Sequence, residues 1–238
     1  MSGHSKWATI KHKKSMADAR RGKVFSKLSK AITVAVKEGG VDEATNFALR
    51  LAIQKARQAN MPKENIERAI ARGQGSGGEG ALEVALYEGM GPGGVSILVE
   101  VLTDNKNRAL TNIKTIFNKN GGNMDAKVLW QFERKGVVRA EAEESIADKD
   151  NFELSLIEAG AEDINWDGSR VEIISALSDL QAVEKAVSEA GLKVESAEPE
   201  YIAKDKIKLS EADEEKLMKF LELLDDDDDV NNVFTNAA

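Results

Sequence analysis

The sequence predicts an α+β protein of several domains: an N-terminal three-helix bundle and two α+β domains, the last a ferredoxin-like βαββαβ unit inserted into the middle one. Three observations predict this fold class. Apolar residues first recur at helical spacing, a Gly-rich stretch then interrupts the chain, and strand-like and helix-like segments alternate beyond it. The expected domains are residues 1–73, residues 81–134 together with 200–238, and residues 135–199.

The N-terminal bundle is predicted from three amphipathic segments that follow an extended arm, residues 1–14. Ser15 suits the N-cap of the first helix, which should end at Gly39-Gly40. Asp42 is expected to cap the second helix, and Pro62 suits the first turn of the third. Each helix has one apolar face, formed in the first by Val24, Phe25, Leu28, Ile32, Ala35 and Val36. Short helices of this kind bury their apolar faces against one another, which predicts a bundle.

The clearest domain boundary is the stretch RGQGSGGEG, residues 72–80, which has no apolar side chain to bury. Beyond it, residues 82–88 and 95–103 are β-rich runs joined by the loop GMGPGG. A helix capped by Asp104 and ending at residue 120 should follow, and then a strand over residues 127–133. This β, β, α, β unit needs a second helix to cover its sheet.

The next segment, residues 136–198, is predicted to be complete in itself. Strands over 137–141, 161–165, 171–175 and 193–197 and helices over 150–159 and 180–190 give the order βαββαβ of the ferredoxin-like fold. Pro199 is expected to close this unit. A strand near Tyr201, a helix over 210–224 and a strand over 230–234 then supply the missing helix of the interrupted domain, which makes the middle domain discontinuous.

Charge is distributed unevenly along the chain, whose formal net charge is −8. Residues 1–72 carry 16 Lys and Arg against 6 Asp and Glu, a net of +10, which leaves −18 for residues 73–238. A basic segment in an acidic chain is a natural docking site for a polyanion, and nucleic acid is the first candidate.

Several function classes are disfavoured by the residues present. Cysteine is absent, which excludes thiol catalysis and thiolate metal sites, and the histidines, His4 and His12, both lie in the basic arm. Residues 89–94 match G-x-G-x-x-G, but a strand follows instead of a helix, so we expect a turn between strands, or alternatively a flexible loop that approaches a partner's backbone. Asp225–Asp229 is expected to be a solvated acidic turn rather than a Mg²⁺ site. We therefore expect no catalytic residue, metal or cofactor, and no membrane span.

The candidate nucleic-acid-binding residues fall into three groups. In the arm, Trp7 could stack on an unpaired base or anchor the arm to the bundle. Along the first helix the cations step by three or four residues and share a face. Two further cations oppose the dipole of the helix after Asp104, as they would beside a bound anion, although they could equally extend into water. The predicted site residues are Lys6, Trp7, Lys11, His12, Lys13, Lys14, Arg20, Arg21, Lys23, Lys27, Lys30, Lys106 and Arg108.

Six stretches of the chain resemble the YebC/PmpR family: SGHSKWATIKHKK, DARRGKVFSKL, NMPKENIERAIARG, YEGMGPGGVSILVE, LTDNKNRA and DDVNNVFTN. The resemblance covers essentially the whole chain and implies three domains, a mature N-terminal arm and a cytoplasmic regulator of gene expression. Bacterial members are described as DNA-binding transcriptional regulators, whereas the mitochondrial branch activates translation of cytochrome c oxidase. Two departures stand out: Met90 replaces a usual aromatic residue, and the Gly/Ser loop that usually follows Gly121-Gly122-Asn123 is shortened.

Taken together, the residues and the resemblance predict a non-enzymatic, cytoplasmic, monomeric regulator that binds nucleic acid, with DNA-binding transcriptional regulation as the first choice. The alternative is a translation factor or translational activator associated with the ribosome or with RNA. A mostly acidic protein with a basic tip and Gly-rich loops would suit insertion into ribosomal RNA.

Overall fold

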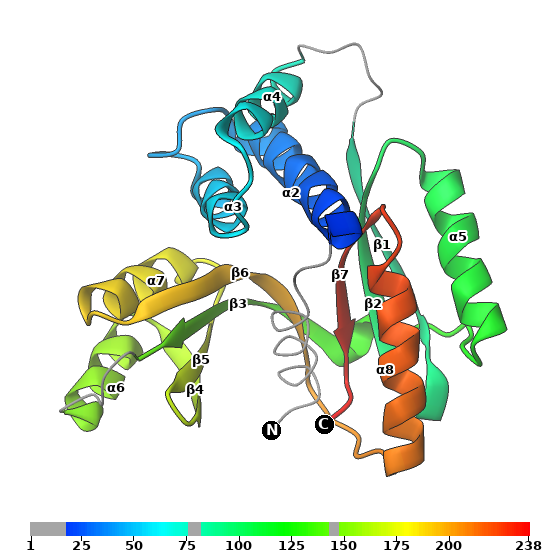
Figure 1. The fold of residues 1–238 in the computed structure, drawn as a ribbon. Helices are drawn as coiled ribbons and strands as arrows, with labels where there is room; N and C mark the ends of the chain where they lie inside the picture. Colours follow the sequence, from blue (N-terminus) through cyan, green and yellow to red (C-terminus); the bar gives the residue numbers. More distant parts are fainter. Residues whose placement is uncertain (1–17, 76–81, 143–147) are drawn as a thin grey trace. The chain divides into compact units, whose positions relative to one another are not determined.

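The structure is a computed structural model that describes residues 18–75, 82–142 and 148–238, with side chains from Arg21 onward. It confirms the α+β class (Figure 1). The chain forms two compact units: the first comprises the residues up to Phe132 together with Ala203–Ala238, and the second is Glu133–Ile202. In the part of the chain that is described, no helix combines the length and apolar composition that a membrane span needs.

The described part of the first unit begins with the helices α2 (Asp18–Gly39), α3 (Phe47–Gln58) and α4 (Lys63–Gly73). Their apolar faces form one core in which Ile32, Leu49 and Ala56 are fully buried. The expected cap of the second helix was wrong: Asn46, not Asp42, caps α3, because its side-chain oxygen accepts the N–H of Leu49 at 3.0 Å. Its amide group also donates to the Ala35 carbonyl at 2.7 Å, so Asn46 joins α3 to α2. Asp42 instead stabilises the preceding turn.

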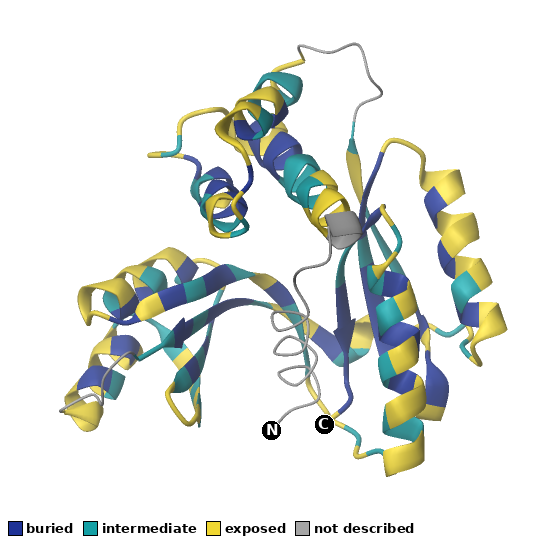
Figure 2. Cartoon of the chain, viewed as in Figure 1, coloured by how far each residue is buried: buried dark blue, intermediate teal, exposed yellow. Residues whose placement is uncertain are grey.

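An antiparallel three-stranded sheet completes the first unit, with β1 (Glu83–Met90), β2 (Ser96–Thr103) and β7 (Val230–Thr235) in the order β1-β2-β7. The GMGPGG segment connects β1 to β2 through the short 3-10 turn η1 (Pro92–Gly94). Helices α5 (Lys106–Lys119) and α8 (Glu211–Asp225) pack on the sheet, and the rings of Phe117 and Phe220 meet edge to face at 4.9 Å. Buried residues line the inner side of α5, and its outer side is exposed (Figure 2).

The second unit is built from β3 (Phe132–Glu141), α6 (Lys149–Glu158), β4 (Ala161–Asp167), β5 (Arg170–Ser175), α7 (Leu180–Glu189) and β6 (Lys193–Ala203). Its four-stranded sheet has the order β4-β5-β3-β6. The elements follow one another as β, α, β, β, α, β, which is the order of a split βαβ unit. Val138, Leu156, Ile173 and Val183 are among its fully buried side chains.

Two expected strand ends were wrong. Residues 129–131 form a 3-10 turn, η2 (Leu129–Gln131), and β3 then runs without interruption from Phe132. The Glu88 carboxylate accepts the N–H groups of Val128 and Leu129, so these donors do not enter a strand ladder. Pro199 does not end a strand either, because β6 continues through it to Ala203. β6 lies at the edge of its sheet, where a residue without an N–H group is tolerated.

Candidate nucleic-acid interface

The structure describes only some of the residues of the predicted nucleic-acid-binding site. The arm residues lie outside the described part of the chain, and Arg20 belongs to α2 without a described side chain. The remaining candidates are Arg21, Lys23, Lys27 and Lys30 on α2 and Lys106 and Arg108 on α5. The candidates outside are Lys6, Trp7, Lys11, His12, Lys13 and Lys14.

Lys23, Lys27 and Lys30 share one face of α2, and that face contacts the acidic segment Asp225–Asp229. The Lys23 ammonium donates to the Asp226 carbonyl at 2.9 Å. Lys27 donates to the carbonyl of Asp225 and lies 3.3 Å from its carboxylate. The helical spacing of these lysines therefore places them together, as the sequence predicts, but against carboxylates and carbonyls of the same chain.

The position of these lysines at the end of α8 has a physical reason. The last carbonyls of an α-helix lack intrahelical partners and carry partial negative charge. The carbonyls of Asp225 and Asp226 accept from Lys27 and Lys23, so α2 supplies the cations that this C-terminus requires. The same cations offset the five aspartates, whose charge at the C-terminal end of a helix would otherwise be unfavourable.

Asp229 is the most deeply buried of the five aspartates, with 5% of its side chain exposed. The expectation of a fully solvated acidic turn is thus wrong at this position. Its Oδ1 lies 2.7 Å from Lys30 Nζ, and its Oδ2 lies 2.9 Å from Arg108 Nη2. Burial by itself would raise the pKa of Asp229, but the hydrogen bonds from Lys30 and Arg108 outweigh burial and lower the pKa below its ordinary value.

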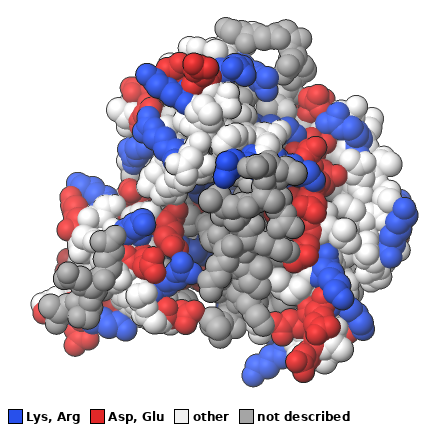
Figure 3. All heavy atoms as spheres, viewed as in Figure 1, with Lys and Arg blue, Asp and Glu red and all other residues white. Residues whose placement is uncertain are grey.

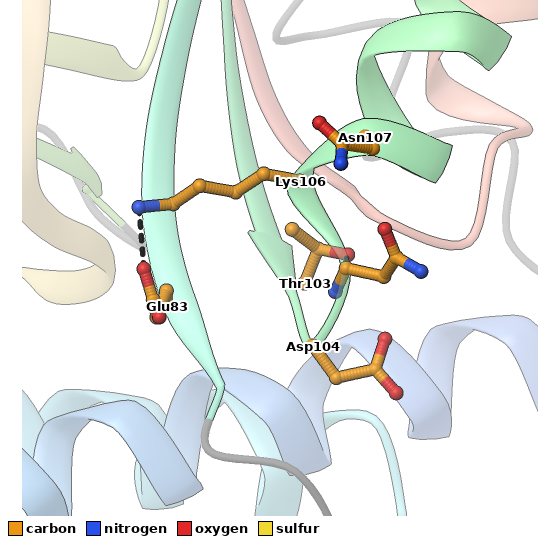
Figure 4. Close-up of a pocket in the computed structure, with 6 residues that line it drawn as sticks. Glu83, Thr103, Asp104, Lys106 and Asn107 are labelled. Carbon is orange, nitrogen blue, oxygen red and sulfur yellow. Dashed lines mark hydrogen bonds and ion pairs between the residues drawn. The ribbon is translucent and has the colours of Figure 1, made fainter.

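Lys106 and Arg108, at the N-terminus of α5, are both paired with carboxylates. Lys106 extends across β1 to Glu83, and both residues line a pocket of about 270 Å³ (Figure 4). Arg108 contacts Asp104 at 2.7 Å as well as Asp229. These carboxylates explain why cations are tolerated at a helix N-terminus without a bound anion. The hydrogen bond and charge of Lys106 also lower the pKa of Glu83.

The same helix start offers few free donors to an anion. Asn105, rather than the expected Asp104, caps α5, and its side chain accepts the N–H of Arg108 at 3.0 Å. The pocket is lined by Glu83, Thr103, Asp104, Asn105, Lys106 and Asn107. Because two of these residues are carboxylates, the pocket is a poor receptor for a phosphate.

Sequence reasoning missed two features of this unit. The first is the partnership between α2 and the acidic segment, for which opposite charge was the only signal. The second is Trp130, which is 70% exposed. A strand over residues 127–133 would place Trp130 on the same face as Val128 and Phe132, which are both buried. The 3-10 turn breaks that alternation and leaves the indole in water.

Two family models together match nearly the whole chain. Residues 5–76 match the model of the TACO1/YebC protein N-terminal domain, and residues 82–237 match that of the TACO1/YebC second and third domain. A probable transcriptional regulatory protein of Caldanaerobacter subterraneus subsp. tengcongensis is 49% identical over 100% of this chain and 98% of the relative. One of Corynebacterium kroppenstedtii is 50% identical over 99% and 95%, respectively.

A solved structure also matches. The crystal structure of a conserved hypothetical protein from Aquifex aeolicus superposes with a TM-score of 0.84 at 37% identity, covering 93% of this chain and 91% of that one. Two family models that together span nearly the whole chain, and relatives of almost equal length, confirm the resemblance seen in the sequence. The chain belongs to the TACO1/YebC family, whose curated relatives carry the names of transcriptional regulators.

Proposed function

We propose that this protein regulates transcription by binding DNA through its basic N-terminal segment, without a catalytic step of its own, in the cytoplasm. The observation that carries the proposal is the separation of charge: residues 1–72 have a net charge of +10 in a chain of −8. Such a segment attracts the phosphate backbone while the acidic remainder is repelled by it. The names of the relatives support the regulatory role.

In this proposal the phosphates are held by the arm and by the first turns of α2. The arm contributes Lys6, Lys11, Lys13 and Lys14 with His12, and α2 contributes Arg20, Arg21 and Lys23. Trp7 either stacks on a base or fixes the arm to the bundle. The Lys23 side chain is exposed, and its ammonium group donates to the main-chain carbonyl of Asp226. A phosphate can replace that carbonyl at little cost, because both partners are accessible to water.

A stricter condition applies to phosphate binding by Lys27, Lys30, Lys106 and Arg108. Each is engaged by a carboxylate of the same chain, so a phosphate must displace Asp225, Asp229, Glu83 or Asp104 before it can bind. Added salt weakens both the protein–phosphate contacts and these ion pairs. We therefore assign the main phosphate contacts to the arm and to the start of α2.

The experiment that tests DNA regulation compares specific with random sites. Chromatin immunoprecipitation would supply candidate promoters, and fluorescence anisotropy at physiological salt would give Kd values for each promoter and for random duplex of equal length. We expect at least one promoter to bind about 10³-fold more tightly than random duplex. A ratio near one at every site would contradict the proposal. Co-sedimentation with ribosomes that depends on residues 1–14 would replace it with a role in translation.

The contribution of the arm is tested by the triple variant Lys11→Glu, Lys13→Glu and Lys14→Glu. We expect weaker binding to any duplex and a salt dependence flatter by about 0.9 in log–log slope for each lost contact. The matched control is Lys185→Glu, Lys193→Glu and Lys216→Glu, which changes the net charge equally at exposed positions elsewhere. Equal losses in both triple variants would mean that only net charge matters, and no loss in the arm variant would remove the arm from the site.

A further inference from the structure

The lysine-bearing face of α2 is covered by the acidic segment that follows α8. Only 17% of the Lys27 side chain and 18% of the Lys30 side chain are exposed. Lysine is rarely buried to this extent without a partner, because its ammonium group is strongly hydrated. Here the partners are the carboxylates of Asp225 and Asp229, at 3.3 and 2.7 Å. The face that the sequence assigns to a polyanion is therefore occupied by carboxylates of the same chain.

The charges at this contact sum to a negative value. The five aspartates of the acidic segment lie against four cations, which gives a local net charge of −1. The cations are Lys23, Lys27 and Lys30 of α2 and Arg108 of α5. In Figure 3, red and blue atoms adjoin where Figure 1 places the end of α8. A phosphate backbone that approaches this surface therefore meets mixed charge instead of a cationic stripe.

The acidic segment presents the same kind of acceptors as a phosphate backbone. Its main-chain carbonyls accept hydrogen bonds from Lys23 and Lys30, each at 2.9 Å, and its first carboxylate accepts from Lys27. Each lysine thus already has oxygen acceptors at the distance that a phosphodiester chain would provide. A phosphate gains less from an ammonium group whose charge is balanced by a carboxylate. The acidic segment and nucleic acid therefore compete for the same lysines.

The shape of the acidic segment and much of its charge depend on different residues. Asp229 is buried between its two cations, and its N–H donates to Asp227 Oδ1 at 2.9 Å. The other carboxylate oxygen of Asp227 accepts from Asn112 Nδ2 at 3.2 Å. These two aspartates hold the turn in place. The remaining three have partly or fully exposed side chains: Asp225, Asp226 and Asp228.

Exchange of partners at this face requires side-chain rotation only. The long stems of Lys23 and Lys27 can rotate from the acidic segment toward a phosphate while the backbone of α2 stays in place. Contacts of this kind with exposed or half-exposed partners contribute little to stability, so the exchange is cheap. Lys30 differs, because it neutralises the buried Asp229 and stays with it. Lys23 and Lys27 are therefore the exchangeable cations.

We propose that the acidic segment is an autoinhibitory competitor, which holds Lys23 and Lys27 and thereby weakens the binding of nucleic acid to the start of α2. This inference rests on the proposed function and names its regulation. Phosphate contacts carry no sequence information, so the competitor weakens binding to duplexes of every sequence. Its removal should accordingly strengthen binding to random duplex.

The test compares the full chain with the triple variant Asp225→Asn, Asp226→Asn and Asp228→Asn. Asparagine keeps the size of the side chain and the main-chain carbonyl, and loss of negative charge at the end of α8 favours folding. Fluorescence anisotropy with a fluorescein-labelled random duplex of 20 base pairs gives Kd at several salt concentrations. We expect the variant to bind at least about threefold more tightly. Its log–log salt slope should be steeper by about 0.9 for each lysine that passes to a phosphate.

A second triple variant controls for net charge. Asp125→Asn, Glu158→Gln and Glu215→Gln remove the same three charges at exposed positions elsewhere. Because charges beyond about 10 Å are screened at physiological salt, this control should bind within about twofold of wild type. An equal gain in both triple variants, or no gain in either, overturns the competitor.

A double-mutant cycle tests whether the gain passes through Lys27. Lys27→Gln is introduced into wild type and into the triple variant of the acidic segment, and urea unfolding verifies that all four proteins are folded. Lys27→Gln should weaken duplex binding by at least about threefold more in the triple variant, where the ammonium group is available to phosphate. A purely structural role for the contact with Asp225 predicts equal losses in both backgrounds, and that result overturns the competitor.

The outcomes separate the competitor from the proposed function. If a promoter binds about 10³-fold more tightly than random duplex but the triple variant behaves like its control, the competitor is overturned and DNA regulation stands. If the triple variant binds random duplex more tightly through Lys27 but no promoter is preferred, the competitor is supported and DNA regulation fails. If neither wild type nor the triple variant binds a duplex, both proposals fail.

Discussion

Lys30 and Asp229 are 199 residues apart in the sequence, yet Lys30 Nζ lies 2.7 Å from Asp229 Oδ1. The carboxylate is almost fully buried and shares Arg108 as its second cationic partner. This pair joins helix α2 to the segment that precedes β7. It also accounts for a basic face that the sequence alone assigns to a ligand.

Replacement of Lys30 by Met should destabilise the first unit. The substitution keeps most of the apolar stem but leaves Asp229 with Arg108 alone, and weakening the satisfaction of a buried carboxylate costs about 1–3 kcal/mol. Urea unfolding followed by circular dichroism measures the free energy of unfolding. Lys23→Met is the matched control, with an expected change of less than about 1 kcal/mol, because its partner is exposed. Equal effects of both variants would contradict a special role for Lys30.

The stability contributed by Asp229 should depend on pH. Its pKa is lower in the folded protein than in the unfolded chain, so folding favours the ionised form. This contribution is complete above the unfolded-state pKa of about 3.9 and is lost as the pH falls through the lower folded-state pKa. Asp229→Asn should therefore be less stable than wild type at pH 7, with a gap that narrows below about pH 4. Unfolding titrations of both proteins between pH 7 and below pH 4 measure the difference in their free energies of unfolding. A difference that stays constant with pH would refute this prediction.

Arg139 holds together a buried charge cluster in the second unit. Its Nη2 lies 2.8 Å from Glu172 Oε2 and 3.0 Å from Glu200 Oε2, and its Nη1 donates to Oε1 of Glu200. Burial alone would lower the pKa of Arg139, but the two carboxylates raise it, so the guanidinium stays charged. Arg139→Met removes the cation between two buried glutamates and should cost about 3–5 kcal/mol.

The control for this cluster restores neutrality. In Arg139→Met combined with Glu172→Gln and Glu200→Gln, much of the lost stability should return, because the two side chains that faced the guanidinium are then neutral. Trp166 in β4 meets Phe152 edge to face, and its fluorescence reports on the second unit. If the triple variant is no more stable than Arg139→Met, packing around the guanidinium rather than its charge explains the loss.

The two ends of the GMGPGG segment should differ in their tolerance of alanine. A Cβ on Gly89 would lie 2.7 Å from Phe117 Cε1 and 2.8 Å from the Asn123 carbonyl oxygen, so Gly89→Ala should cost more than about 2 kcal/mol. A Cβ on Gly94 meets nothing within 4 Å, and only its φ of +74° opposes alanine, at about 1–2 kcal/mol. Thermal unfolding of both variants measures the difference, which should disappear if this turn rearranges freely.

The sequence predicts where helices and strands form better than it predicts which of them pack or pair together. Helices α5, α7 and α8 follow from apolar spacing and from the glycine or polar residues near their ends, which are local signals. The continuous strands β3 and β6 were missed because Pro199 and the polar residues near Gly136 look like interruptions when the neighbouring strand is unknown. An edge position makes Pro199 harmless, and only the assembled sheet identifies the edge.

In the candidate site, too, features set by local sequence could be predicted, whereas contacts between distant segments could not. Helical spacing correctly places Lys23, Lys27 and Lys30 on one face, since that face depends on local geometry alone. The acidic segment Asp225–Asp229 that contacts this face of α2 is distant in the sequence. A run of aspartates by itself predicts a solvent-exposed turn. Trp130 was overlooked because its neighbours alternate like a strand, and the Glu88 carboxylate that diverts them is distant in the sequence.

The pairing of α2 with the end of α8 also orders the events of biosynthesis. The helical bundle is translated first, but the carboxylates that hold its lysines, and the strand β7 that completes the sheet beside β2, lie within residues 225–235. A chain emerging from the ribosome can fold its second unit while the first still lacks these residues. The lysines of α2 therefore lack their carboxylate partners, and β2 lacks its second neighbouring strand, until residues 225–235 have been synthesised.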